Sequence, residues 1–417
     1  MSAGRAAMRY LFLHQFYWPD LAAATQLLTD LTREISARGH EVTVICGRSG
    51  NAGADRSERP AVEIIHVPEA PFARGRLARV LSSVTFLAAA FARGLFARRP
   101  DVVVSLTAPP LLSTFGSWLA AIRGARHFIW EMDMYPDVAV DVGLLARGSL
   151  LARITGTLAD RARRGATAVI ALGDCMKGRL LARGIPPGKI VIAPNWADGG
   201  LYADAAPIPE GPLGVIYPGN LGAAHDVRTI AAAMAALQGD EGFVFTFVGG
   251  GSRRDELESF CREHDLAQAR FIGYCTPREL AAVPLGEASI GLATQNPACL
   301  GTVVPSKIFP LMAAGRPVLF IGPRESTPAL IVEKFGCGWQ IDAGPCEALV
   351  ALLKKLAADR CEVRAAGKRA REAFLAHFDR PEGVARICAI LGAHPLRERV
   401  GRTAGEASQA RAGVVAG

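Results

Sequence analysis

Short runs rich in valine, isoleucine and aromatic residues alternate with amphipathic stretches of helix length, and this alternation restricts the fold more than any other feature. Helical periodicity is clear in residues 24–39 and 150–165. The apolar runs do not alternate with polar residues, which is typical of strands buried on both faces of a parallel sheet. Such strands are predicted in the first half at residues 10–16, 41–47, 62–67, 101–106, 127–132, 167–172 and 189–195.

The alternation stops at residues 194–212, which are rich in proline, glycine and alanine and are typical of a linker. It then restarts, with strands predicted at 214–220, 243–251, 269–274, 288–294, 316–322 and 338–342. We therefore expect an α/β protein with two doubly wound, Rossmann-like domains that face each other across a cleft. The predicted division is 1–198 for the first domain, 199–365 for the second, 366–395 for C-terminal helices as candidates for crossing back to the first, and 396–417 for a disordered tail.

The nine cysteines are scattered, with no C-x-x-C pair and an odd total. This pattern fits a reducing cytosol and fits neither a disulfide framework nor a zinc site. The N-terminal residues lead directly into a predicted strand and lack the apolar core and cleavage site of a signal peptide. We therefore expect a cytoplasmic protein.

Positive charge is concentrated in the first half of the chain. Residues 1–195 carry 24 Lys and Arg against 15 Asp and Glu, whereas the remainder carries 23 against 24. A basic half is typical of a protein with an acidic partner, such as nucleic acid, anionic lipid or a phosphorylated acceptor. A solvated, arginine-rich surface is the alternative.

The longest apolar stretch, residues 80–96, is interrupted by Arg93, and no apolar run is expected to reach the roughly 20 residues that span a bilayer. A helix over this stretch would have cationic ends, since arginines flank it at positions 74, 76, 79, 98 and 99. That combination suits an anchor on an anionic membrane surface. A buried domain helix with charged ends is the alternative.

No motif for redox, phosphoryl-transfer or metallohydrolase chemistry is convincing. Residues 248–257, VGGGSRRDEL, follow a predicted strand but lack the third glycine of the dinucleotide-binding fingerprint and an acid on the next strand. No Walker loop, nucleophile elbow or H-E-x-x-H is present, and the eight histidines show no ligand spacing. What remains is a ligand site in the cleft, at the carboxyl ends of the strands.

Residues 301–320, GTVVPSKIFPLMAAGRPVLF, combine a loop, a short helix and a buried strand. Ser306 and Lys307 stand where the helix begins, and unpaired amides at a helix start bind phosphate. Pro310 is tolerated if the regular helix starts at or near it, with 305–309 as a turn. Lys307 is either a solvated lysine or a phosphate ligand. Because a cation is unfavourable beside a helix N-terminus, an anion between the two is the better explanation.

Six longer segments follow one another in the order and spacing of a known family. They are WEMDMYPDVAVDVGLL, VIALGDCMKGRLLARGIPPGKIVIAPNWAD, YPGNLGAAHDVRTIAAAM, FVFTFVGGGSRRDELE, ARFIGYCTPREL and VPSKIFPLMAAGRPVLF. Over about residues 8–392 the chain resembles the retaining, nucleotide-sugar-dependent glycosyltransferases of family four, which have the two-domain B-type glycosyltransferase (GT-B) fold. It is similar to the branch that adds N-acetylated amino sugars during O-antigen, capsule and exopolysaccharide assembly.

The resemblance implies that the second domain binds the nucleotide-sugar donor and the first receives the acceptor. Asp133 and Lys307 are expected to be catalytic: Lys307 would stabilise the leaving diphosphate, and Asp133 would accept the acceptor hydroxyl's hydrogen bond or stabilise oxocarbenium-like charge. Asp137 is expected on the acceptor side or as a helix cap. The residues expected to bind the donor are Thr25, Gly219, Asn220, His225, Gly250, Tyr274, Thr302, Val303, Val304, Ser306 and Lys307.

The sequence departs from the family pattern in four charged positions. Asn220 and His225 occupy the places of the usual arginine and lysine on the donor diphosphate, and the paired glutamates fall on Thr302 and Pro310. A His225 cation would be the one remaining charged contact of the four. The phosphate is then expected to be bound mainly by the amides of residues 303–306, the helix start, Ser306 and Lys307.

The resemblance implies a peripheral enzyme on the inner face of the cell membrane. It would transfer a hexose, expected to be an N-acetylated hexosamine, from a UDP-linked donor to a polyprenyl-diphosphate-linked saccharide, with retention of configuration and without a metal or other cofactor. Nucleic acid is not an expected partner. A nucleotide-sugar epimerase of the same architecture, which would act on nucleotide sugar alone, and a non-catalytic nucleotide-sugar-binding homologue remain alternatives.

Overall fold

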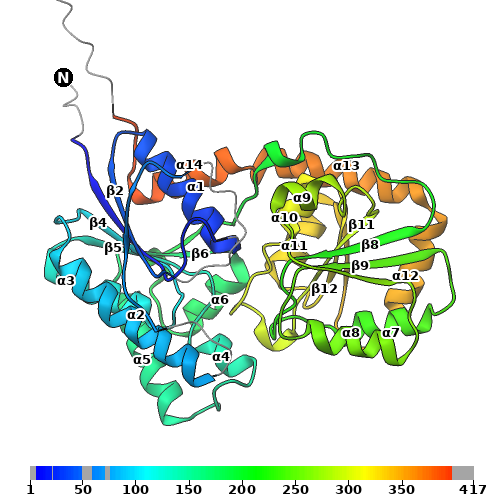
Figure 1. Cartoon of the computed structure of the whole chain (residues 1–417), viewed down its shortest axis with the longest axis horizontal. Helices are drawn as coiled ribbons and strands as arrows, with labels where there is room; N and C mark the ends of the chain where they lie inside the picture. Colours follow the sequence, from blue (N-terminus) through cyan, green and yellow to red (C-terminus); the bar gives the residue numbers. More distant parts are fainter. Residues whose placement is uncertain (1–5, 21, 49–58, 71–75, 397–417) are drawn as a thin grey trace, which may run out of the picture.

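The computed structural model describes residues 6–20, 22–48, 59–70 and 76–396. They form two parallel sheets, each covered by helices on both faces (Figure 1). The thirteen predicted strands are all present, and the prediction of two doubly wound α/β domains is confirmed. The predicted tail lies outside the described residues from residue 397 onward.

The first sheet has seven strands in the order β3-β2-β1-β4-β5-β6-β7. Its central strands are buried along their whole length, as the valine-rich β4 shows, whereas the edge strand β3 is exposed at both ends. This difference explains why the central runs are apolar without alternation. The bounds are β1 Arg9–Leu13, β2 Glu41–Cys46, β3 Glu63–His66, β4 Val102–Ser105, β5 Arg126–Trp130, β6 Ala168–Ala171 and β7 Ile190–Ile192.

The second sheet has six strands in the order β10-β9-β8-β11-β12-β13. In both sheets the order reverses direction beside the first strand, between β1 and β4 and between β8 and β11. Ligands of open α/β sheets bind at the carboxyl ends of strands at such a reversal. The bounds are β8 Leu213–Pro218, β9 Phe243–Val248, β10 Ala269–Ile272, β11 Ile290–Thr294, β12 Val318–Ile321 and β13 Gly338–Ile341.

Helices form a layer on each face of each sheet. In the first domain α2 and α3 share one apolar core with the sheet, while α1, α6 and α14 share the other. In the second, α7, α8 and α12 cover one face and α10, α11 and α13 the other. The bounds are α1 Ala23–Ala37, α2 Arg76–Phe96, α3 Leu112–Arg123, α4 Asp137–Asp141, α5 Leu150–Gly165, α6 Asp174–Ala182, α7 Arg228–Ala236, α8 Arg254–Glu263, α9 Pro277–Ala282, α10 Ile308–Ala313, α11 Thr327–Phe335, α12 Glu347–Ala358, α13 Arg360–His377 and α14 Arg380–Leu391.

The chain crosses between the domains twice. The first crossing is the predicted linker, which packs against the first domain. Its Trp196 is buried and stacks on Trp130 with 5.7 Å between ring centroids. The second crossing is made by α13 and α14 (Figure 1), and α14 packs against α1 through Ile387 and Leu391. The last described helix therefore belongs to the core of the first sheet.

Helix α2 contradicts the expectation that no apolar run is long enough to span a bilayer. Among the described residues it is the one helix long and apolar enough to cross a membrane, over Ala78–Phe96 with a mean hydropathy of 1.3. Core helices of soluble proteins pass the same test, and Phe86, Leu87 and Ala90 of α2 pack in the core of the first domain. The rest of the helix is largely exposed, since 28% of the apolar stretch is buried. Arg74 and the Arg76 side chain lie outside the described residues.

Candidate functional site

A polar cluster lies at the carboxyl end of β8, where the second sheet reverses direction. Gly219 directly follows the strand with a φ of +93°, a conformation that glycine adopts readily and other residues rarely do. The turn brings the backbone carbonyl of Asn220 back over the strand, where it accepts a hydrogen bond from the Tyr217 hydroxyl at 3.0 Å. This turn forms the floor of the cluster.

Lys307 reaches this floor from the opposite side. Its Nζ donates to the Tyr217 hydroxyl at 2.8 Å and to the Asn220 carbonyl at 3.3 Å, and it lies 4.5 Å from the centroid of the Tyr217 ring. No carboxylate of the described residues lies within ion-pair distance of it. Desolvation by burial therefore lowers the pKa of Lys307 to about 7. A cation without an acidic partner is available to a bound anion.

His225 completes the surroundings of Lys307, with its Nε2 2.9 Å from Nζ. Burial, followed by the nearby Lys307 charge, lowers the pKa of His225 well below its usual value. A neutral imidazole has one donor and one acceptor nitrogen: Nε2 faces the Lys307 ammonium, and Nδ1 lies 3.0 Å from the Gly222 backbone nitrogen and 3.2 Å from the Gly222 carbonyl oxygen. The expectation of a His225 cation is thus wrong, because the histidine is buried beside a stronger base.

Two more predicted donor residues, Tyr274 and Gly250, join the same cluster. The Tyr274 hydroxyl donates to Oδ1 of Asn220 at 2.6 Å. A Cβ at Gly250 would lie 2.7 Å from the Tyr274 hydroxyl, so the tyrosine covers this glycine closely. The exposed Tyr274 ring therefore lies on the glycine loop that follows β9. Gly219, Asn220, His225, Gly250, Tyr274 and Lys307, which are scattered in the sequence, meet at one sheet edge.

The loop before α10 differs from the expected phosphate cradle. The Val303 N–H bonds the Cys299 carbonyl, and Pro305 has no N–H, so only the Val304 and Ser306 amides of 303–306 are free of hydrogen bonds to described residues. Helix α10 has six residues, so its dipole adds little. The site depends chiefly on the Lys307 side chain.

Pro310 occupies the third position of α10, whose first residue is Ile308. The N–H groups of the first turn have no partner within a helix, so the missing N–H of Pro310 costs no hydrogen bond. The expectation that the helix starts near the proline is confirmed. The Ser306 carbonyl accepts from Phe309, which closes the turn before it.

Asp133 follows β5 and lies at the contact between the domains. It forms an isolated antiparallel bridge with Val303 of the second domain, and its N–H donates to the Thr107 hydroxyl at 3.1 Å. Its carboxylate has no hydrogen bond or ion pair to any described residue. Burial, with repulsion from Glu131, raises the pKa of Asp133 to about 6. A carboxyl group with this pKa can both accept and return a proton near neutral pH.

Thr302 joins the domains beside this bridge. It is buried, and its hydroxyl lies 3.1 Å from Oδ2 of Asp141, to which it donates. Arg179 donates to the same carboxylate oxygen at 2.6 Å. Asp141 and Arg179 were missed by sequence reasoning, although the spacing of Asp137 and Asp141 places both on one side of α4.

The remaining predicted residues have other surroundings. Val304 packs in the core of the first domain, and Ser306 makes no side-chain hydrogen bond to a described residue. Thr25 is buried in the first turn of α1 with its hydroxyl unpartnered among the described residues. Within the described residues, no hydrogen bond joins Thr25 to the Lys307 cluster.

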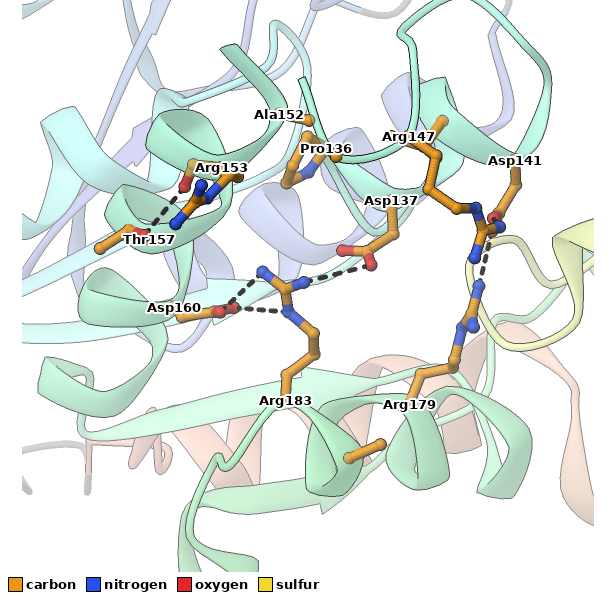
Figure 2. A pocket seen from close by; sticks show the side chains of 13 residues that line it. Pro136, Asp137, Asp141, Arg147, Ala152, Arg153, Thr157, Asp160, Arg179 and Arg183 are labelled. Carbon is orange, nitrogen blue, oxygen red and sulfur yellow. Dashed lines mark hydrogen bonds and ion pairs between the residues drawn. The ribbon is translucent and has the colours of Figure 1, made fainter. Parts of the chain in front are cut away.

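Asp137 lines a cavity of about 510 Å³ between α4, α5 and α6 of the first domain (Figure 2). Its Oδ1 lies 3.5 Å from Arg183, which also binds Asp160. Asp137 is the first residue of α4, and the N-terminus of this helix has no side-chain cap hydrogen bond. The Asp137 carboxylate lines the cavity instead. Among the described residues no group of three or more His, Cys, Asp and Glu could hold a metal ion.

Comparisons with known proteins agree with this geometry. Residues 22–196 match the family model described as "Glycosyl transferase 4-like domain". The probable glycosyltransferase WbjE of Pseudomonas aeruginosa is 25% identical over 279 residues, which cover 62% of this chain and 67% of that protein. The crystal structure of Anabaena HepE in complex with UDP and glucose is similar with a TM-score of 0.70 at 15% identity, over 92% of this chain and 99% of that one. WaaG, a glycosyltransferase involved in lipopolysaccharide biosynthesis, is similar with a TM-score of 0.69 at 18% identity, over the same shares of the two chains.

The solved structures are too distant in sequence to show more than the fold, which is the B-type glycosyltransferase fold. The matched domain and the Pseudomonas relative add the class of activity. Together they support a glycosyltransferase.

Proposed function

We propose that this protein transfers a sugar from a UDP-linked donor to a polyprenyl-diphosphate-linked saccharide, with retention of configuration. An N-acetylated hexosamine is the proposed sugar, and no metal or other cofactor is required. The observation that carries the proposal is the Lys307 ammonium at the sheet edge, which has three neutral partners and no acidic partner among the residues that the structure describes. UDP and glucose are bound by the similar Anabaena HepE, which favours a nucleotide-sugar donor here.

The donor diphosphate would lie between Lys307 and the glycine loop after β9. Lys307 exchanges its long 3.3 Å contact with the Asn220 carbonyl for a phosphate oxygen and stabilises the charge that develops as the diphosphate leaves. The free N–H groups of Val304 and Ser306 add uncharged donors. The exposed Tyr274 ring is a surface on which the base can stack.

The acceptor would approach from the first domain. Asp133 faces the donor domain through its bridge to Val303, and Val303 lies four residues before Lys307 in the sequence. The Asp133 carboxylate accepts the hydrogen bond of the acceptor hydroxyl, which attacks the sugar on the face that the diphosphate leaves. The departing diphosphate takes up the proton of that hydroxyl.

The enzyme would work on the inner face of the cell membrane, docked through its first domain. The exposed apolar part of α2 and the net positive charge of residues 1–195 support this placement. Both features favour an anionic lipid surface over nucleic acid, because the apolar residues would have no use on a polyanion in water.

The proposal is tested with purified protein and a panel of UDP-sugars. One of them is expected to raise the melting temperature, because ligand binding to the folded state stabilises it. That sugar should then be transferred to an isoprenyl-diphosphate-linked saccharide, and NMR of the product should show the donor's anomeric configuration. Conversion of the UDP-sugar without acceptor would instead identify an epimerase, and binding without turnover would identify a non-catalytic homologue.

A further inference from the structure

The cavity between α4, α5 and α6 (Figure 2) is lined by charged side chains and shares no lining residue with the Lys307 cluster. Four arginines and three aspartates line it, and all seven come from the first domain. They are Arg147, Arg153, Arg179, Arg183, Asp137, Asp141 and Asp160. A cavity of about 510 Å³ has the size of a small-molecule site.

Arg147 and Arg153 are the poorly neutralised arginines of the cavity. Arg147 and Arg179 share one carboxylate, that of Asp141, and Arg147 holds it at 3.4 Å while its own side chain is 83% exposed. Arg153 is exposed and has no ion pair with any described residue. By contrast, Arg183 is bound to two carboxylates. Arg147 and Arg153 can therefore turn to a bound anion at little cost.

Two further lining atoms are buried without a hydrogen-bond partner among the described residues: Oδ2 of Asp137 and Nε of Arg179. Buried polar atoms are nearly always paired, so unpaired ones point to a missing water or ligand. The carboxylate oxygen needs a donor such as a hydroxyl, whereas the guanidinium needs an acceptor. The site therefore suits a molecule that carries both hydroxyl groups and negative charge.

Helix α5, which supplies Arg153 to the cavity, also exposes three large apolar side chains in its first five residues. Leu150, Leu151 and Ile154 are 72%, 60% and 50% exposed, and they flank Arg153 in the sequence. Large side chains exposed next to one another mark a surface that contacts an apolar partner. An isoprenoid chain beside a diphosphate has this combination of charge and apolar surface.

We propose that this cavity binds the diphosphate of the isoprenoid-linked acceptor, with Arg147 and Arg153 on its phosphates and Asp137 on a hydroxyl of the attached saccharide. The inference rests on the proposed function and adds the place where the acceptor's charged group is held. The Asp141 carboxylate, which Arg147 and Arg179 share, also accepts from Thr302 of the donor domain. Acceptor binding at the cavity therefore takes place beside the contact that holds the two domains together.

The test is calorimetry of the full chain saturated with UDP, so that the donor site is filled, with farnesyl diphosphate and inorganic diphosphate as probes. Farnesyl diphosphate is used below its micelle-forming concentration. The variant carries Arg147→Gln and Arg153→Gln. The control carries Arg161→Gln and Arg164→Gln, which remove the same charge from exposed positions of α5 that do not line the cavity.

Farnesyl diphosphate should bind the cavity variant at least about tenfold more weakly than the wild type, because two charge-assisted contacts are lost. The control should bind within about twofold, inorganic diphosphate more weakly than the farnesyl compound, and both variants should keep wild-type affinity for UDP. Equal affinity of both variants for the farnesyl compound, equal binding of the two probes, or loss of UDP affinity in the cavity variant would each overturn the assignment. Failure of the wild type to bind UDP would instead count against the proposed function.

Discussion

The Lys307 ammonium has only neutral partners, so its removal isolates the contribution of one charge. Lys307→Met should weaken UDP binding by about tenfold to a hundredfold, the range for a charge-assisted contact. Lys334→Met is the control, because Lys334 is an exposed lysine over an aromatic ring of the same domain. Calorimetry that finds equal affinity for UDP in the two folded variants would remove Lys307 from the site.

The same residue gives UDP binding a pH dependence. Burial lowers the pKa of Lys307 to about 7, so above pH 7 the amine is largely neutral in the free protein. A bound diphosphate favours the cation and raises that pKa. UDP binding at pH 8 should therefore take up a proton, and affinity should fall by up to about tenfold per pH unit above 7. Calorimetry in two buffers of different ionisation enthalpy measures the uptake, and Lys307→Met should abolish it.

Asp133 is expected to serve the reaction rather than donor binding. Asp133→Asn should lower turnover about a hundredfold, because a neutral amide accepts the acceptor hydroxyl's hydrogen bond more weakly than a carboxylate does, while UDP affinity stays within about twofold. Asp204→Asn is the matched control, because Asp204 is exposed and has no hydrogen bond or ion pair to another described residue. Turnover of the Asp133 variant close to that of the control would reassign Asp133 to the domain contact alone.

For individual residues, the sequence predicted which side chains lie close together but not their protonation states or hydrogen-bond partners. Asn220, Tyr274 and Lys307 follow strands or begin a helix, and parallel strands end at one edge of a sheet, so their proximity was predictable. The neutral state of His225 depends on burial, and the bond between Thr302 and Asp141 depends on how the domains meet. Local sequence patterns predict neither the protonation state of His225 nor this contact between the domains.

Among the elements, α5 is fixed to the loop after β5 by a buried ion pair. Arg163 donates to the Glu131 carboxylate at 2.7 and 3.0 Å, and both side chains are almost fully buried. Arg163→Met should lower the free energy of unfolding by about 3–5 kcal/mol, because it leaves a buried carboxylate without its partner. Adding Glu131→Met should restore part of that loss. Urea denaturation measures both, with Arg164→Met as the exposed control, and a single variant as stable as the control would contradict the assignment.

Element positions were the most predictable level of the structure. The thirteen strands were located from short runs rich in β-branched and aromatic residues, and the central ones are apolar throughout because they are buried on both faces. The length of the apolar stretch of helix α2 was predicted less well. The predicted apolar run, residues 80–96, is too short to span a bilayer, whereas the apolar stretch of the helix begins two residues earlier, at Ala78, and is long enough to do so.

For the whole molecule, the proposed membrane docking follows from α2. Val80, Leu81 and Val84 are 59%, 53% and 56% exposed on a domain that carries the net positive charge. Replacing all three by serine should reduce co-sedimentation with vesicles of phosphatidylethanolamine containing one third phosphatidylglycerol. Wild-type binding should itself fall as salt rises.

The control for that experiment is the triple serine variant of Val283, Leu330 and Leu375, which are exposed apolar residues of the second half of the chain. It removes comparable apolar surface from the part with almost no net charge. Equal sedimentation of the two triple variants, or strong binding to vesicles without phosphatidylglycerol, would show that α2 does not direct docking.

The place of α14 also determines the order in which the protein can be completed during synthesis. Residues Val384, Ile387 and Leu391 leave the ribosome after both sheets, yet they cover α1, one of the first elements made. Domains of most proteins fold in the order in which they emerge. Here the second domain can close its core while the apolar side of α1 in the first is still exposed to solvent or to chaperones. The half of the molecule that is translated first is thus the half that is finished last.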